Sequence, residues 1–315
     1  MTRKLVRKKP NFFIIGAPRA GTTSLYFCLK DHPDIFMSPR KEPRFFAFEG
    51  LIEKKGPFGR QPLPSYSTSW EKYLTLFEKA RHEKVIGEAS TMYLYHPKAP
   101  ERMQRYLGSE VKLVAVLRHP VERAFSHYLY NVNRGAEPCL AFEEALAAEE
   151  ERIAQGWIEY FHYKSMGLYS EQVKRYLDIF GADNLLVFLY EDLDKSPLLV
   201  VKKILEFLGL EASFLPDTFA RINPSGIPRF KFLTQLIKKT PSSFKQVLKT
   251  VIPESIRLKI VEWELWQNIR PVSKPRISLE TRKALLDYYQ QDILKLQQLL
   301  GRDLSHWLKI EEKEG

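Results

Sequence analysis

The chain has 315 residues, of which 44% are hydrophobic and 28% are charged, and its formal net charge at pH 7 is +11. This composition is typical of a soluble globular protein and excludes an intrinsically disordered chain, and a chain of this length can form a single α/β domain with an elaboration. The positive charge attracts anions, so nucleic acid, anionic lipid, acidic polysaccharide and a phosphorylated small ligand are all candidate partners.

The basic N-terminal arm, residues 1–10, runs directly into Phe12–Ile15 without the apolar stretch of a signal peptide. No run of about 18 or more apolar residues follows, so the sequence predicts no membrane-spanning helix. The only two cysteines, Cys28 and Cys139, are too few for a disulfide framework and favour a reducing compartment. We therefore expect a cytoplasmic protein.

Short apolar runs bounded by turn residues alternate with stretches of helical period, which predicts a parallel sheet with crossover helices. The expected strands are Phe12–Ile15, Ile35–Met37, Val85–Gly87, Val111–Leu117 and Leu185–Tyr190. The expected helices are Thr22–Lys30, Trp70–Phe77, Pro97–Leu107, Val121–Asn131, Phe142–Gln155, Leu168–Phe180 and Pro197–Leu208. The fold class is therefore α/β, with three layers around a central parallel sheet of about five strands.

Three further segments complete the chain, which we expect to form one domain over residues 1–315. Glycine and proline cluster in Gly50–Pro64, which predicts a loop over the edge or mouth of the sheet. Residues 229–276 are rich in lysine and arginine interleaved with apolar residues and are expected to form a basic helical insert. Within residues 277–310, an amphipathic helix over Leu279–Leu300 is expected to pack on the core and to end at Gly301.

The first expected strand is followed by the segment Gly16-Ala17-Pro18-Arg19-Ala20-Gly21-Thr22-Thr23-Ser24 and then by a helix. A glycine-bounded turn there directs backbone N–H groups and the positive end of the helix dipole at one point, which predicts a P-loop-like phosphate-binding loop. An ATP-binding P-loop has lysine where this chain has Thr22, and here the positive charge lies in the loop at Arg19. The pattern argues against nucleoside triphosphate chemistry, and the alternative is a turn that only connects strand and helix.

A second phosphate motif follows the strand Val111–Leu117. Arg118 stands at the strand's C-terminal end, where its guanidinium can form a bidentate pair with a phosphate, and Pro120 lies where a helix can begin. Ser126 falls within that helix. The alternative is a surface arginine and a helical serine bonded to its own turn.

Together these two motifs resemble those of the sulfotransferases that use 3′-phosphoadenosine 5′-phosphosulfate (PAPS), in particular the branch with glycosaminoglycan (heparan sulfate) sulfotransferase domains and their bacterial relatives. The resemblance implies transfer of a sulfuryl group from PAPS to a hydroxyl or amine, with release of adenosine 3′,5′-bisphosphate. It implies that the 5′-phosphosulfate is bound by Pro18, Arg19, Ala20, Gly21, Thr22, Thr23 and Ser24, and the 3′-phosphate by Arg118 and Ser126. Many members have lysine in place of Arg19, and a guanidinium does not act as a proton donor.

Between the motifs lies the segment Lys41-Glu42-Pro43-Arg44-Phe45-Phe46. By itself, a glutamate among basic residues indicates a solvated ion pair. The resemblance implies instead that Glu42 is the catalytic base, a role that contributes about 10² to 10⁴ in rate. Arg19, aided by Lys41, is then expected to stabilise charge on the leaving nucleotide. The histidines show no ligand-like spacing, so no metal is expected.

Weaker matches add further candidates. In Gly87–Tyr93, relatives often have lysine where this chain has Ala89. Glu88 is a second candidate base, with the ordering of a loop as its alternative role, and Ser90 is a candidate substrate contact together with Lys41. Arg229 stands where the family brings a late loop over the 3′-phosphate, and a simple linker is the alternative.

Two other functions stay open. A P-loop kinase would need the lysine that Thr22 replaces and a magnesium-binding aspartate at a strand end, where this chain has Arg118. A nucleic-acid or membrane-surface binding protein is suggested by residues 229–276. We expect no nucleic-acid partner, and the insert is a candidate for peripheral membrane contact or for covering the acceptor. The acceptor is a carbohydrate by resemblance, and a lipid headgroup or small metabolite is equally compatible with the residues.

Overall fold

The computed structural model describes residues 8–212, 227–228, 269–270 and 276–310. The chain divides into two compact units, Met1–Phe219 with Ile277–Gly315, and Ala220–Arg276. In the second unit, β8 (Ile227–Pro228) pairs antiparallel with β9 (Ile269–Arg270). Of the expected basic insert, residues 229–268, which include Arg229, and residues 271–275 lie outside the described residues, as do residues 1–7 of the N-terminal arm.

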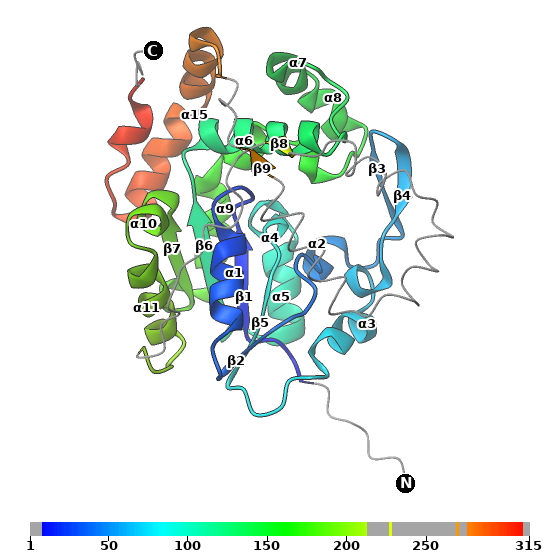
Figure 1. Cartoon of the computed structure of the whole chain (residues 1–315), viewed down its shortest axis with the longest axis vertical. Coiled ribbons are helices and arrows are strands. Elements are labelled where there is room, and N and C mark those ends of the chain that lie inside the picture. Colours follow the sequence, from blue (N-terminus) through cyan, green and yellow to red (C-terminus); the bar gives the residue numbers. More distant parts are fainter. Residues whose placement is uncertain (1–7, 213–226, 229–268, 271–275, 311–315) are drawn as a thin grey trace. The chain divides into compact units, whose positions relative to one another are not determined.

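The first unit is built on a parallel sheet of five strands in the order β2-β5-β1-β6-β7 (Figure 1). The strands are β1 (Phe12–Gly16), β2 (Ile35–Met37), β5 (Val85–Ala89), β6 (Lys112–Leu117) and β7 (Leu185–Leu189). The central strand β1 is buried throughout, as expected for a parallel sheet covered on both faces. The predicted sheet is confirmed, and each strand boundary lies within two residues of the expected one.

Helices cover the sheet on both faces, so the predicted α/β fold is confirmed (Figure 1). Helices that lie where they were expected are α1 (Thr22–Lys30), α5 (Ala99–Leu107), α6 (Pro120–Asn133), α9 (Tyr169–Phe180), α11 (Pro197–Phe207) and α15 (Leu279–Leu300). The expected helix Trp70–Phe77 is α3 (Trp70–Leu74), followed by a 3-10 turn over Thr75–Phe77. Helix α1 packs beside α11, whereas α9 packs against α5 and α15.

Two expectations about local structure are wrong. The expected helix Phe142–Gln155 is divided at Ala148 into α7 (Phe142–Ala147) and α8 (Glu149–Ala154). The division places Glu149 in the first turn of α8, where its buried carboxylate accepts hydrogen bonds from the amides of Lys164 and Ser165. This tertiary contact outweighs the local preference for one continuous helix.

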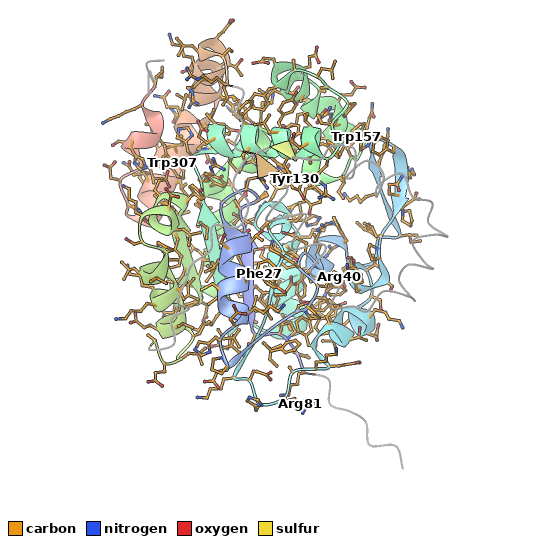
Figure 2. The ribbon with its side chains drawn as sticks, viewed as in Figure 1. Phe27, Arg40, Arg81, Tyr130, Trp157 and Trp307 are labelled. Atoms are coloured by element: carbon orange, nitrogen blue, oxygen red, sulfur yellow. The ribbon has the colours of Figure 1, made fainter. Side chains whose placement is uncertain are left out.

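The second wrong expectation is the loop over Gly50–Pro64. The segment contains an antiparallel hairpin of β3 (Glu53–Gly56) and β4 (Gly59–Pro62). Lys54 forms an ion pair of 2.9 Å with Glu159, and the hairpin is also joined to the chain at Trp157, which Figure 2 labels beside it. The abundant glycine and proline concealed the strands because these residues build the hairpin itself: Pro57 is in its two-residue turn, and Gly59, the first residue of β4, has a left-handed φ of 84°.

The C-terminal helix α15 begins after Ser278, whose hydroxyl caps the amide of Thr281, and ends at Gly301 in the left-handed conformation. Its buried side chains pack against α9 and α6. A final 3-10 turn, Ser305–Leu308, buries Trp307 completely. Among the described residues, no helix combines the length and the apolar character needed to cross a membrane.

Candidate active site

The turn between β1 and α1 is held tightly against its neighbours. The amide of Ala17 donates to the carbonyl of Val116 in β6 at 2.7 Å. Gly21 precedes α1 with a φ of 84°, and a Cβ at this position would lie 2.6 Å from Cδ2 of Leu193. Conformation and space therefore both favour glycine here. The turn places the N-terminus of α1, the positive end of the helix dipole, at this loop.

Arg19 connects this loop to the second motif. Its backbone has a φ of 70°, which turns the side chain toward α6, where Nε donates to Oγ of Ser126 at 3.2 Å. The guanidinium lies over the ring of Tyr130, 4.7 Å from its centroid, and Figure 2 labels this tyrosine on α6. Burial lowers the pKa of Arg19 to about 10, and the charge of Arg118 acts in the same direction. Arg19 is therefore still a cation at neutral pH.

Arg118 lies at the end of β6, as the sequence predicts, and contacts the same loop. Its Nη1 donates to the carbonyl of Arg19 at 2.9 Å, and its guanidinium lies over the ring of Tyr190, 4.9 Å from its centroid. Within the described part of the chain, neither arginine forms an ion pair with a carboxylate. Two cations without a carboxylate partner beside a helix N-terminus form a site for an anion.

The other predicted loop residues differ in accessibility. Pro18, Ala20, Thr22 and Ser24 are buried, whereas Arg19, Gly21 and Thr23 are partly exposed. The structure thus brings the predicted phosphate residues of both motifs together, and a ligand reaches the partly exposed ones first.

Glu42 lies on a turn beside the end of β5. Its amide donates to the carbonyl of Ala89 at 2.9 Å, and its carboxylate accepts from Oγ1 of Thr91 at 2.9 Å. Nζ of Lys41 lies 3.3 Å and Nε of Arg44 3.6 Å from the carboxylate. Burial acts to raise the pKa of Glu42, but these two cations and the bonds from Thr91 outweigh it and hold the pKa below its ordinary value. Glu42 is therefore ionised at neutral pH, with 18% of its side chain exposed.

The turn that presents Glu42 has an unusual backbone. Glu42 and Arg44 have left-handed φ values of 63° and 61°, on either side of Pro43. Each such residue costs about 1–3 kcal/mol, so the surroundings must hold the turn in place. Ser90 does so, because its hydroxyl accepts the amide of Arg44 at 3.0 Å.

Glu88 contacts Ser90, which holds this turn, and is fully buried. Its carboxylate accepts hydrogen bonds from the hydroxyls of Tyr73 at 2.9 Å, Tyr93 at 2.6 Å and Ser90 at 2.7 Å. Burial raises the pKa of Glu88 to about 7, against the opposing effect of the three hydroxyls. Glu88 and Ser90 have no exposed surface, unlike Glu42.

Two tyrosines that sequence reasoning missed lie between the phosphate residues and the base. The guanidinium of Arg44 lies over the ring of Tyr160, 4.7 Å from its centroid, and Tyr160 also interacts electrostatically with Glu42 and Tyr130. Tyr130 is one helical turn after Ser126, and this spacing could have identified it. Tyr160 is in a short 3-10 turn, Glu159–Phe161, and has no comparable sequence signal.

A metal centre has no support among the described residues, where no three His, Cys, Asp or Glu side chains are grouped closely enough to hold an ion. The site brings together two arginines, a helix N-terminus and an ionised carboxylate. Such a site can bind an anionic donor and accept a proton.

Comparison with known proteins identifies the family. Residues 9–224 match the model of the sulfotransferase domain, a range that includes both phosphate motifs, Glu42 and Glu88. A solved structure of a sulfotransferase from Alicyclobacillus acidocaldarius is 32% identical, with a TM-score of 0.72, and the match covers 96% of this chain and 100% of that one. The chain therefore belongs to the sulfotransferase family.

Curated relatives include two enzymes of Mus musculus. Carbohydrate sulfotransferase 15 is 27% identical over 256 residues, which cover 65% of this chain and 44% of the relative. Heparan sulfate glucosamine 3-O-sulfotransferase 3A1 is 24% identical over 302 residues, which cover 95% of this chain and 65% of the relative. The chain thus spans less than half the length of the first of these two relatives.

Proposed function

We propose that this sulfotransferase uses PAPS as its donor and releases adenosine 3′,5′-bisphosphate. The observation that carries this proposal is the contact between the two phosphate motifs, in which Arg118 donates to the Arg19 carbonyl and Arg19 donates to Ser126. PAPS has anionic groups at both the 5′ and the 3′ positions of one ribose, and adjoining cationic sites suit such a ligand. The 5′-phosphosulfate would lie at the N-terminus of α1 and the 3′-phosphate at Arg118 and Ser126.

The acceptor's oxygen or nitrogen attacks the sulfur, the bond from sulfur to the phosphate oxygen breaks, and the acceptor's proton moves to Glu42. Glu42 suits this role because it is ionised and partly exposed. Arg19, with Lys41 in support, stabilises the negative charge that develops on the leaving nucleotide. Arg19 is a permanent cation at neutral pH, so it acts by charge and hydrogen bonds and not as a proton donor.

Glu88 has a different role in this proposal. Because its carboxylate is buried under three protein hydroxyls, an acceptor does not reach it. Its bond to Ser90 orients the serine hydroxyl so that a lone pair meets the amide of Arg44, which holds the turn that presents Glu42. Glu88 and Ser90 are thus proposed as supports for the base.

The proposed acceptor is a carbohydrate. Relatives whose names contain carbohydrate and heparan sulfate glucosamine support this choice. Beside Glu42, the Tyr160 ring offers an apolar face and Lys41 and Arg44 offer hydrogen-bond donors, a combination suited to a polar ring with many hydroxyls. A lipid headgroup and contact of the basic insert with a membrane are the alternatives that an acceptor screen has to include.

A cytoplasmic location is also part of the proposal. Its support is that Cys28 and Cys139 are both free thiols in the structure, as a reducing compartment would keep them.

Thermal unfolding with added nucleotides tests the donor assignment. Adenosine 3′,5′-bisphosphate at about 100 times its Kd should add roughly 2.7 kcal/mol to the free energy of unfolding, whereas adenosine 5′-monophosphate at the same concentration should add less. Arg118→Ala should remove this difference, and Arg105→Ala, which changes an exposed arginine paired with Glu49, should keep it. Greater stabilisation by ATP with magnesium would contradict the proposal and favour a kinase.

A further inference from the structure

The N-terminus of α9 is capped by a side chain from α15, more than a hundred residues later in the chain. Leu168 occupies the capping position and has no polar side chain to offer. The Asp292 side chain acts as the cap in its place. Its Oδ2 accepts a hydrogen bond from the amide of Tyr169 at 2.7 Å, and its Oδ1 accepts one from the amide of Ser170 at 3.1 Å. The Ser170 hydroxyl also donates to this carboxylate. A carboxylate at this end of α9 satisfies its amides and complements its dipole.

Tyr169, the first residue of α9, carries this anchoring to the phosphate site. Its side chain is fully buried, and its hydroxyl donates to the carbonyl of Arg118 at 2.9 Å. The pairing between β6 and β7 ends at Leu117, so the strand ladder does not hold the Arg118 carbonyl. The hydroxyl of Tyr169 supplies the partner that the ladder lacks.

The segment after α15 braces the same strand ends. The ring centroid of Trp307 lies 6.3 Å from that of Tyr169 and 6.0 Å from that of His119. Figure 2 labels Trp307 near α10 (Tyr190–Lys195). Arg302 forms two hydrogen bonds of 2.6 Å with Asp192 in α10. The segments that follow Arg118 and Tyr190, whose side chains stack on each other, therefore both contact the C-terminal part of the chain.

We propose that Asp292 and Tyr169 are positioning residues for the donor. Asp292 fixes the first turn of α9, and Tyr169 then fixes the backbone of Arg118 where its guanidinium meets the 3′-phosphate. Neither residue touches the donor. The proposal rests on the proposed function, in which Arg118 binds that phosphate, and it assigns a part in donor recognition to a helix outside the residues that match the family model.

Tyr169→Phe tests this with the smallest change, because it removes one hydroxyl and keeps the ring. We expect the Kd for adenosine 3′,5′-bisphosphate, measured by calorimetry, to rise about threefold to tenfold while the Kd for adenosine 5′-monophosphate stays unchanged. In turnover with PAPS, KM for the donor should rise and kcat should not change. Asp292→Asn, which keeps one acceptor oxygen, should shift the same ratio of Kd values in the same direction.

Tyr289→Phe is the matched control. Tyr289 is also fully buried, and its hydroxyl also donates to a backbone carbonyl, that of Lys164 at 2.9 Å, but it does not contact Arg118. We expect this variant to lose similar stability and to keep the wild-type ratio of the two Kd values.

Three results would overturn the positioning role. Wild-type protein that binds the two nucleotides equally would overturn the proposed function and this inference together. Wild-type protein that prefers the 3′-phosphorylated nucleotide, with the same preference in Tyr169→Phe, would overturn the inference alone. An equal loss of preference in Tyr289→Phe would show that general destabilisation, and not the bond to Arg118, controls donor binding.

Discussion

The two halves of the candidate site use charge in opposite ways. In the phosphate half, the guanidinium groups of Arg19 and Arg118 contact a hydroxyl, a carbonyl and aromatic rings, and neither pairs with a carboxylate of the residues that the structure describes. In the base half, the Glu42 carboxylate is surrounded by Lys41, Arg44 and Thr91. The first half is left with positive charge for a ligand, whereas in the second half Lys41 and Arg44 neutralise the charge of the Glu42 carboxylate. Under the proposed function, such a site recognises its donor by charge and selects its acceptor by shape and hydrogen bonds.

Glu42→Gln tests the comparison at the point of largest expected effect. The change removes the proposed base but keeps a side chain of the same size, so we expect kcat to fall by about 10² to 10⁴ and the Kd for adenosine 3′,5′-bisphosphate to stay constant. Steady-state turnover with PAPS and calorimetry measure the two quantities. Glu53→Gln, at an exposed glutamate paired with Arg60, is the control. Unchanged kcat in Glu42→Gln would remove this residue from the mechanism.

Glu88 sharpens the comparison through its effect on stability. Its pKa is about 7 in the folded protein and 4.5 ordinarily, so the folded state holds the proton more tightly. Its contribution is therefore fully present below pH 4.5 and declines as the pH rises to about 7, by roughly 3 kcal/mol.

Glu88→Gln should abolish this decline, because glutamine does not titrate. Chemical denaturation gives the free energy of unfolding of both proteins between pH 4.5 and 7. As the pH rises, we expect the wild-type value to fall relative to that of Glu88→Gln. Parallel stability profiles for the two proteins would mean that the carboxyl titrates in the folded state as it does in the unfolded chain.

Arg118→Ala and Arg118→Lys probe the phosphate half. Loss of a charge-assisted bond should raise the Kd for adenosine 3′,5′-bisphosphate about tenfold to a hundredfold. Lysine keeps the charge but not the planar fork, so we expect it to restore only part of the affinity. Full recovery in the lysine variant would mean that the phosphate half senses charge alone, without bidentate geometry.

The two phosphate motifs and the single strands of the sheet could be predicted from the sequence because each is a run of contiguous residues. Strand β1, the turn through Gly21 and helix α1 follow one another directly, and the expected boundaries are close to the observed ones. The exact environment of Glu42 depends on Ser90 and Thr91, which follow strand β5 and lie more than forty residues later in the chain. The sequence names such residues but does not place them beside one another.

Contacts between distant segments were the least predictable. Tyr160 faces Arg44 from a turn more than a hundred residues away, and Asp292 caps Tyr169 from a helix that sequence analysis assigned to packing. The hairpin of β3 and β4 was concealed by its own turn residues. Local patterns contain no information about such pairs, because tertiary packing selects them. Arg229 lies outside the described residues and stays a prediction.

The smallest expected effect concerns the turn that the phosphate half requires. In Gly21→Ala, the left-handed φ of 84° costs about 1–2 kcal/mol of stability, and the new Cβ must displace the Leu193 side chain. Gly301→Ala is the control, because Gly301 is also left-handed, with a φ of 58° and a ψ of 33°, but no atom lies within 4 Å of the added Cβ. Thermal unfolding should show similar backbone costs in both variants. Only Gly21→Ala should also weaken nucleotide binding, since Leu193 belongs to the same helix, α10, as Tyr190, which stacks on Arg118. Equal nucleotide affinity in the two variants would show that the phosphate half tolerates movement of α10. Its affinity would then come from the arginines and not from the close packing of the Gly21 turn against Leu193.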